Sequence, residues 1–270
     1  MLLDAADVTF GYRGAPRRPP LEASADGLVI RGVSLSVPRG GFLGILGPNG
    51  SGKTTLLKLI GGAISPTSGT VRLGGRLVSA IPRRELARRL AVVPQETHLA
   101  FDYTALEIVL MGRYPHLGAF AFEGPADLAA AREALATTGT ADLADRAFAT
   151  LSGGEKQRVI IASALAQLDA RAGGGARPDG LLLLDEPTAS LDLRYQIEVA
   201  SLLARLNADH GIAVVLSTHD LRLARALCSR LALLSAGRVL AEGTPADVLT
   251  PALVGQLYGI GADLAAPVLA

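Results

Sequence analysis

One octapeptide restricts the fold of this chain more than any other feature of its sequence. Residues 47–54 read GPNGSGKT and fit the pattern G-x-x-x-x-G-K-[ST]. The apolar run FLGIL precedes them, and the helical pattern TLLKLIGG follows. This order predicts a strand, a phosphate-binding loop and a helix, because backbone N–H groups of such a loop and the helix N-terminus together surround phosphate oxygens. A chance glycine-rich turn is the alternative, and both flanking segments argue against it.

The residues of this loop have distinct predicted roles. The glycines allow backbone N–H groups to turn inward. Lys53 places a positive charge on the β- and γ-phosphates, and the Thr54 hydroxyl can ligate Mg²⁺. The predicted nucleotide-binding residues here are Gly47, Pro48, Asn49, Gly50, Ser51, Gly52, Lys53, Thr54 and Thr55.

A second apolar run ends in two carboxylates. Leu181–Leu184 reads as a buried strand, and Asp185 and Glu186 follow it. At a strand end Asp185 can orient Mg²⁺, directly or through water. Glu186 points in a different direction, because neighbouring side chains alternate along a strand, and it can polarise an attacking water. A solvent-facing acidic pair is the alternative; the phosphate-binding loop earlier in the chain favours the functional interpretation.

Composition limits the remaining possibilities. Of the 270 residues, 49% are hydrophobic, which is enough for a sizeable core. The net charge of +1 gives no overall basic field, so we expect no nucleic-acid partner. The single cysteine excludes an internal disulfide. We expect no signal peptide, because Asp4 and Asp7 interrupt the first apolar residues, and no apolar run approaches the roughly 20 residues that span a bilayer. The mean hydropathy of +0.35 leaves two readings open: an Ala/Leu-rich core, or an apolar surface that a partner covers.

The order of apolar runs predicts an α/β protein. Short buried strands alternating with helical patterns favour a parallel sheet, and the N-terminal region favours antiparallel strands. The predicted core strands are 41–46, 90–93, 181–184, 212–217 and 231–235. The predicted antiparallel segments are 2–9, 28–37 and 70–78. The predicted helices are 54–64, 126–138, 155–169, 196–209 and 221–227. Segments 13–27, 118–125 and 169–180 are expected to be surface loops.

Residues 151–158, LSGGEKQR, resemble the signature motif of ABC ATPases. They stand between the phosphate-binding loop and the acidic pair, as in that family. Ser152 is well placed to cap a helix that starts at Gly153 or Gly154, and the two glycines leave backbone N–H groups open to an anion. In the family, two subunits pair head to tail, with ATP between the loop of one and the signature of the other. The resemblance therefore implies an ATP-hydrolysing homodimer that uses Mg²⁺.

Further residues resemble functional elements of the family. Gln95 is similar to the Q-loop glutamine that touches Mg²⁺ and the attacking water. Asp192, in the segment Ser190–Asp192, resembles the D-loop that crosses to the partner subunit. His219 resembles the switch histidine that contacts the γ-phosphate, and Tyr12 resembles the aromatic residue that stacks on adenine, with Phe10 as its rival. The implied metal-binding residues are Thr54, Gln95 and Asp185, and the implied catalytic residues are Glu186, His219 and Gln95.

The resemblance also implies an architecture. We expect a P-loop NTPase core of the ABC ATPase type, with an antiparallel β subdomain and an inserted helical subdomain at about residues 96–160. The purely helical pattern of residues 126–145 supports this insertion. The single ABC ATPase domain is expected to span residues 2–250, and residues 251–270 are expected to form a C-terminal tail.

One segment points toward a subfamily. Met111–Gly118 reads MGRYPHLG and is similar to a segment in the ATPases of iron–siderophore, haem and cobalamin importers. It implies a peripheral protein on the cytoplasmic face of the inner (cell) membrane. Its partners would be permease subunits docked on this segment and a periplasmic or surface substrate-binding protein. A packed helix start and turn is the structural alternative. The functional alternatives are an ABC transporter for another substrate and a soluble, non-transport ABC ATPase.

Overall fold

The computed structural model describes residues 1–12, 27–97, 101–118, 120–168 and 180–269. The chain divides into two compact units, one made of Met1–Ile81 with Ala213–Ala270 and the other of Pro82–Ile212. The loops predicted at residues 13–27 and 169–180 lie outside the described residues, apart from Gly27 and Gly180. The described part of the predicted loop at 118–125 forms no regular structure before a helix begins at Pro125.

The first unit contains an antiparallel sheet in the order β2-β1-β4-β5, as the N-terminal pattern predicts. Residues of β1 and β2 alternate imperfectly between buried and more exposed positions, because this sheet buries only one face well. The strands are β1 (Leu3–Gly11), β2 (Leu28–Val37), β4 (Ser68–Leu73) and β5 (Arg76–Leu77).

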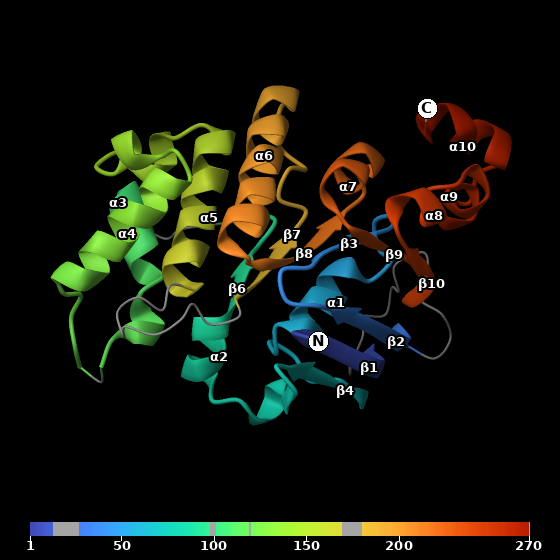
Figure 1. Cartoon of the computed structure of the whole chain (residues 1–270), viewed down its shortest axis with the longest axis horizontal. Helices are drawn as coiled ribbons and strands as arrows, with labels where there is room; N and C mark the ends of the chain where they lie inside the picture. Colours follow the sequence, from blue (N-terminus) through green and yellow to red (C-terminus); the bar gives the residue numbers. More distant parts are fainter. Residues whose placement is uncertain (13–26, 98–100, 119, 169–179, 270) are drawn as a thin grey trace. The chain divides into compact units, whose positions relative to one another are not determined.

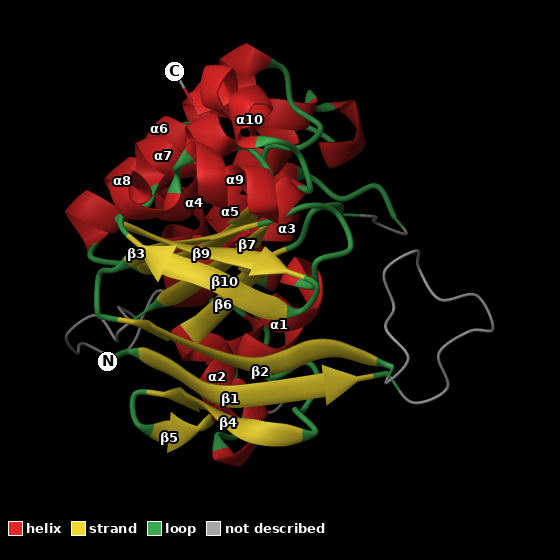
Figure 2. Cartoon of the chain, turned by 90° about the vertical axis from the view of Figure 1, so that its right-hand side faces the viewer, coloured by secondary structure: helices red, strands yellow, loops and turns green. Residues whose placement is uncertain are grey.

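A second layer of strands completes this unit. β3 (Phe42–Leu46) pairs in parallel with both β8 (Ala213–Thr218) and β9 (Arg230–Ser235), and β10 (Arg238–Gly243) adds an antiparallel edge. Every residue of β3 and β8 is buried, which is typical of parallel strands covered on both faces. Figure 2 shows α1 (Lys53–Ile60) between the two layers of strands.

Three further helices of this unit follow β10, and the sequence pattern did not predict them. They are α8 (Pro245–Val248), α9 (Pro251–Tyr258) and α10 (Ala262–Leu269). Val254 and Leu257 of α9 and Ala265 of α10 are buried, so most of the expected tail is folded. The remaining helix, α7 (Leu221–Leu227), matches its predicted range.

The second unit has a parallel strand pair and a helical cluster. β6 (Leu90–Val93) pairs with β7 (Leu181–Asp185), as the parallel α/β prediction requires. Buried residues of three helices form one apolar cluster, and these helices lie side by side in Figure 1. They are α3 (Ala105–Met111), α4 (Pro125–Thr137) and α5 (Gly153–Leu168). Outside this cluster lie α2 (Arg83–Arg89) and α6 (Leu193–His210).

A buried arginine connects the three clustered helices. Arg113, just after α3, is 0% exposed. Its Nε donates to Asp127 Oδ1 of α4 at 3.1 Å, and its Nη1 donates to the Ala166 carbonyl of α5 at 2.7 Å. Burial raises the pKa of Asp127, but hydrogen bonds from the Gly124 N–H and the Arg113 guanidinium outweigh it and hold that pKa below its usual value. The pair therefore stabilises the charged form of Asp127 in the folded unit.

Substituting Asp127→Asn should destabilise the protein in a pH-dependent way. At pH 7 we expect a loss on the order of 3 kcal/mol in the free energy of unfolding, because a buried guanidinium loses its carboxylate. The pKa of Asp127 is lower in the folded protein than in the unfolded chain, so its carboxylate stabilises the fold fully above the unfolded pKa. This contribution disappears as the pH falls through the folded pKa. The difference in stability between variant and wild type should therefore shrink below about pH 4. Urea denaturation at pH 7 and at about pH 2.5 measures this change. Asp142→Asn, an exposed control in the same unit, should change stability little at either pH. A pH-independent loss for Asp127→Asn would contradict this account.

Candidate active site

The phosphate-binding loop connects β3 to α1, and its glycines are required by its backbone path. A Cβ at Gly47 would overlap the Leu234 carbonyl oxygen. Gly50 and Gly52 have φ of 84° and 105°, in the left-handed region that favours glycine. The loop therefore cannot keep this path with side chains at these positions.

The side chain of Lys53 lies against the loop that it follows. Its Nζ donates to the carbonyl oxygens of Gly47 at 2.8 Å and Pro48 at 3.0 Å, and the residue is 5% exposed. Folding therefore holds one positive charge at the loop itself, where a phosphate chain would lie.

Several observations test whether this loop suits an oxyanion. The N-cap of α1 is Gly52, which provides no side-chain acceptor for the first-turn N–H groups. Ser51 Oγ is buried and has no hydrogen-bond partner among the described residues. Uncapped N–H groups, an unpartnered hydroxyl and a buried ammonium group are donors that phosphate oxygens satisfy. The loop fits the phosphates of a nucleotide.

Two threonines and two aromatic rings lie near the start of α1. Thr54 is exposed, whereas Thr55 is buried and its hydroxyl lies 3.4 Å from the Tyr12 hydroxyl. Tyr12 is 46% exposed, and its ring meets the Phe10 ring edge-on, with centroids 4.8 Å apart. The more exposed Tyr12 ring supports its assignment as the adenine-stacking residue, and this assignment stays a prediction.

His219 leaves the sheet beside the phosphate-binding loop. β3 and β8 pair in parallel with Leu46 opposite Thr218, and the Gly47 N–H donates to the Thr218 carbonyl at 3.4 Å. The residues that follow these strands, Gly47 and His219, therefore start from the same edge of the sheet. His219 itself is exposed, and its carbonyl accepts a hydrogen bond from the Tyr258 hydroxyl of α9 at 3.1 Å.

In the second unit, Gln95 and the acidic pair also share a sheet edge. Val93 of β6 lies opposite Leu184 of β7. Gln95 follows β6 and is exposed, whereas Asp185, the last residue of β7, is only 7% exposed. Glu186 has φ of 45°, an uncommon left-handed conformation for a residue with a side chain. This backbone turns the Glu186 side chain away from the direction that a continuing strand would give it.

The signature residues form a capped helix start. The Glu155 N–H donates to Ser152 Oγ at 3.3 Å, and the Ser152 N–H donates to Glu155 Oε2 at 2.7 Å. The Ser152 N–H lowers the pKa of the Glu155 carboxyl, although burial opposes it. The exposed Gly153 begins α5, and a Cβ at the buried Gly154 would overlap the Tyr195 ring of α6. The first-turn N–H groups of Gly153 and Gly154 have no acceptor within the helix, so this terminus also suits an anion.

Asp192 has a structural role that the sequence analysis did not predict. It is exposed and caps α6, where its carboxylate accepts a hydrogen bond from the Tyr195 N–H at 3.1 Å. The sequence analysis also did not identify the roles of Glu155 as a capping partner and of Tyr258 as a hydrogen-bond donor to His219. The S-x-x-E spacing of Ser152 and Glu155 is a capping-box pattern that could have identified the first. No local pattern links Tyr258 to His219, which lie 39 residues apart in the chain.

The predicted site residues divide between the two units. Tyr12, the phosphate-binding loop and His219 belong to the first, and Gln95, Asp185, Glu186, Ser152–Gly154 and Asp192 belong to the second. Among the described residues, no group of three His, Cys, Asp or Glu side chains is arranged to hold a metal ion. The hydroxyl, amide and carboxylate oxygens of Thr54, Gln95 and Asp185 are donors that Mg²⁺ accepts, so their chemistry fits this ion.

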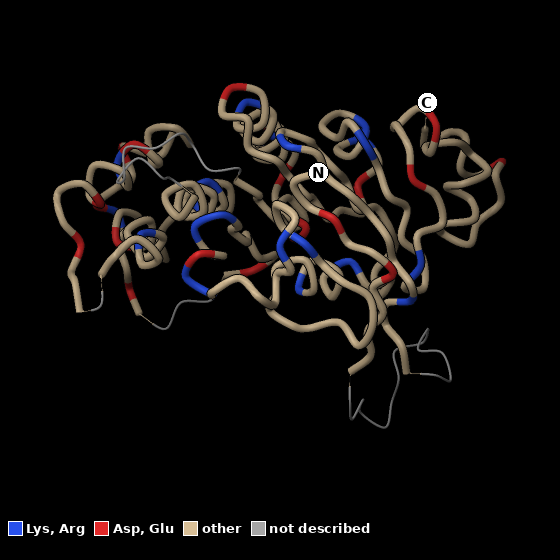
Figure 3. The backbone as a smooth tube through the Cα atoms, turned by 60° about the horizontal axis from the view of Figure 1, so that its bottom comes forward, with Lys and Arg blue, Asp and Glu red and all other residues tan. Residues whose placement is uncertain are grey.

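Basic and acidic residues are interspersed along the chain (Figure 3). In the described part of the chain, no single helix is long and apolar enough to cross a membrane; only the sharply bent pair α9 and α10 meets that test jointly, on length and composition.

Comparison with known proteins agrees with the resemblance. Residues 30–189 match the family model described as ABC transporter. The hemin import ATP-binding protein HmuV of Gloeobacter violaceus is 47% identical over 234 residues, which cover 86% of this chain and 82% of that protein.

Two solved structures are also similar. An ABC transporter assigned to the metal-chelate type, in an inward-facing conformation, has a TM-score of 0.79 and 30% identity, over 96% of this chain and 89% of that one. The dimeric cassette MJ0796 bound to ADP and Pi has a TM-score of 0.72 and 30% identity, over 90% of this chain and 98% of that one. The chain belongs to the ABC transporter ATP-binding family, and it is an ATPase with the ABC cassette fold.

Proposed function

We propose that this chain powers an ABC importer for haem or a related iron chelate or corrinoid. It would act as a homodimer, attached to permease subunits on the cytoplasmic face of the cell membrane. The 47% identity to a hemin import ATP-binding protein is the observation that carries the importer assignment. A periplasmic or surface binding protein would deliver the substrate to the permease.

ATP binding begins at the phosphate-binding loop. The N–H groups at the start of α1, the Ser51 hydroxyl and the Lys53 ammonium group bind the phosphate oxygens, and Tyr12 stacks on adenine. To reach the β- and γ-phosphates, Lys53 exchanges its hydrogen bonds with Gly47 and Pro48 for charged ones, which are stronger. Mg²⁺, when bound by Thr54, Gln95 and Asp185, neutralises charge on the phosphates.

Hydrolysis requires an aimed water molecule. Glu186 accepts a proton from this water, and its left-handed backbone places it outside the strand that ends at Asp185. His219 contacts the γ-phosphate from the strand next to the loop, and Gln95 contacts the water and Mg²⁺. Phosphoryl transfer depends on position and charge more than on covalent chemistry, so each of these roles is one of placement.

The signature supports a dimer with shared sites. In the described part of the chain, the helix starts at Lys53 and at Gly153 both suit phosphate oxygens, and only at the first does a buried lysine ammonium group lie against the preceding loop. In a head-to-tail dimer, Ser152–Gly154 of one subunit bind the γ-phosphate held by the loop of the other. Asp192 lies in the segment that reaches across to the partner subunit. The dimeric form of MJ0796 bound to ADP and Pi supports a nucleotide-bound dimer.

Met111–Gly118 is the proposed docking segment for the permease. Tyr114 is 57% exposed, whereas the neighbouring Arg113 is buried and connects the helical cluster behind it. A rigid base under an exposed aromatic ring suits a short partner helix. The alternatives are a transporter of another substrate and a soluble ABC ATPase without a permease.

Glu186→Gln should separate binding from chemistry. The amide keeps the size of the side chain but cannot accept the proton, so ATP should still bind while hydrolysis slows by roughly 10²–10⁴-fold. The variant should accumulate as a closed dimer with trapped ATP, seen by size-exclusion chromatography with nucleotide analysis. Glu123→Gln, on the exposed loop before α4, should behave as wild type. Full activity in Glu186→Gln would exclude it as the catalytic carboxylate.

Transport measurements test the substrate assignment. The permease and binding protein encoded beside this chain should be reconstituted with it in liposomes, and uptake of haemin, a ferric siderophore, cobalamin and an amino acid should be compared. ATP-dependent uptake of one of the first three is expected, and loss of uptake with Lys53→Ala controls for leakage. Uptake of the amino acid alone would overturn the importer class, and failure to assemble with any permease would favour a soluble role.

A further inference from the structure

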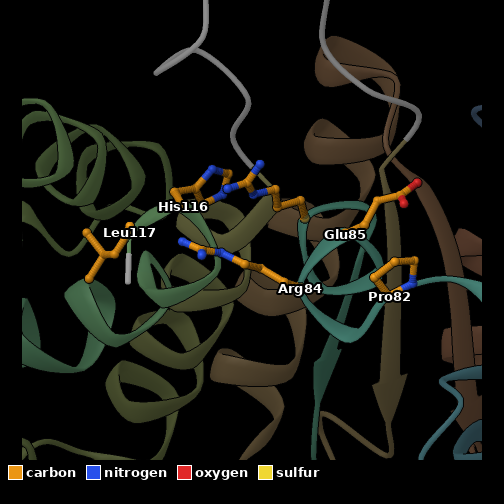
Figure 4. A pocket seen from close by; sticks show the side chains of 7 residues that line it. Pro82, Arg84, Glu85, His116 and Leu117 are labelled. Carbon is orange, nitrogen blue, oxygen red and sulfur yellow. The ribbon is translucent and has the colours of Figure 1, made fainter. Parts of the chain in front are cut away.

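A pocket of about 460 Å³ opens in the second unit beside the proposed docking segment. Figure 4 shows it between α2 and the residues that follow α3. Two arginines and a histidine line it. The lining residues are Pro82, Arg84, Glu85, Arg88, His116, Leu117 and Gly118.

Two arginines in this pocket share one acceptor. Nε of Arg84 and Nε of Arg88 both donate to the Pro115 carbonyl oxygen, at 2.8 Å and 2.7 Å. Since the two residues are four apart on α2, their side chains lie on the same face of the helix. Bonding to one oxygen therefore brings two positive charges close together, an arrangement that costs free energy through their repulsion.

No carboxylate of the described residues forms an ion pair with either arginine. Glu85 also lines the pocket, but Figure 4 shows its carboxylate turned away, while Arg84 reaches toward Leu117. Among the described residues, the shared carbonyl is the acceptor for both side chains, and it occupies only their Nε groups and leaves their terminal nitrogens to a partner. The N–H donors of two neighbouring guanidinium groups match the acceptor oxygens of one carboxylate.

The walls of the pocket are held by α5. The side-chain amide of Gln167 donates to the carbonyls of Ala87 at 2.8 Å and Leu90 at 3.0 Å, at the end of α2. The Gln167 carbonyl accepts a hydrogen bond from His116 Nε2 at 2.8 Å, on the opposite wall. One residue thus fixes both sides, so little ordering is needed when an anion binds.

We propose that this pocket binds an acidic side chain of the permease, placed by the short helix that docks on Met111–Gly118. This inference rests on the proposed function, because it names the chemistry of the same docking surface. The pocket and the docking segment share His116, Leu117 and Gly118, so one partner segment can reach both. The Leu117 side chain and the exposed Tyr114 ring give the partner apolar contact beside the charge, which a free inorganic anion would not use.

The test measures binding of purified subunits to their detergent-solubilised permease at two salt concentrations. The double variant Arg84→Ala/Arg88→Ala should bind at least roughly tenfold more weakly than wild type at low salt, because a paired carboxylate loses its partners. The salt dependence of binding should shrink with it, and basal ATP hydrolysis without permease should not change. Arg83→Ala, which removes a charge from the same helix but not from the pocket, is the matched control.

Substitutions in the permease identify the partner side chain. One cytoplasmic Asp or Glu, changed to Ala, should weaken binding to wild type and have little further effect with the double variant. Unchanged binding of the double variant, or a loss equal to that of Arg83→Ala, would overturn the proposal. Inorganic phosphate that binds the isolated subunit at these arginines, with assembly unaffected by their loss, would also overturn it. If the wild-type protein itself does not bind the permease, this result contradicts the proposed function, and the inference that rests on it is then also wrong.

Discussion

The proposed nucleotide site depends on phosphate charge placed at the uncapped start of helix α1. α1 begins at the end of a fully buried strand with a glycine N-cap, so its first N–H groups have no side-chain acceptor. Lys53 adds a charge that the fold already holds against the loop carbonyls. Strand β8 pairs with the strand that carries this loop, and the same pairing brings His219 to the loop. The proposed binding of phosphate by the loop and the proposed contact from His219 therefore start from one sheet edge.

The sequence predicted the parts of the fold in which local pattern and tertiary environment agree. Fully buried parallel strands are continuous apolar runs, so β3, β6, β7 and β8 were found within a residue or two. Helices α9 and α10 were missed because few polar residues mark a solvent face, and α10 contains Pro267. Helix α3 was missed although Thr104 and Glu107 form a capping box that marks its start.

Candidate site residues were predictable where the chemistry needs adjacent backbone groups, as in GPNGSGKT and LSGG. Contacts between distant residues had no such signal. The bond from Tyr258 to His219 and the two roles of Gln167 arise only when separate helices fold against their neighbours. The roles of Asp185 and Glu186 needed the family resemblance as well, since a strand-end acidic pair alone is ambiguous. The left-handed backbone at Glu186 and the burial of Asp185 are the structural details that distinguish the two residues.

The most direct measurement mixes two inactive variants. Lys53→Ala removes the charge of the phosphate-binding loop, and Ser152→Arg blocks the signature. Each homodimer should be inactive. If loop and signature act across the dimer, a mixed dimer has one site with both defects and one site that is intact. ATP hydrolysis should then reappear when the two purified variants are mixed, and it should depend on their ratio. A mixture that stays as inactive as either variant alone, although chromatography or cross-linking shows that mixed dimers form, would contradict the head-to-tail site.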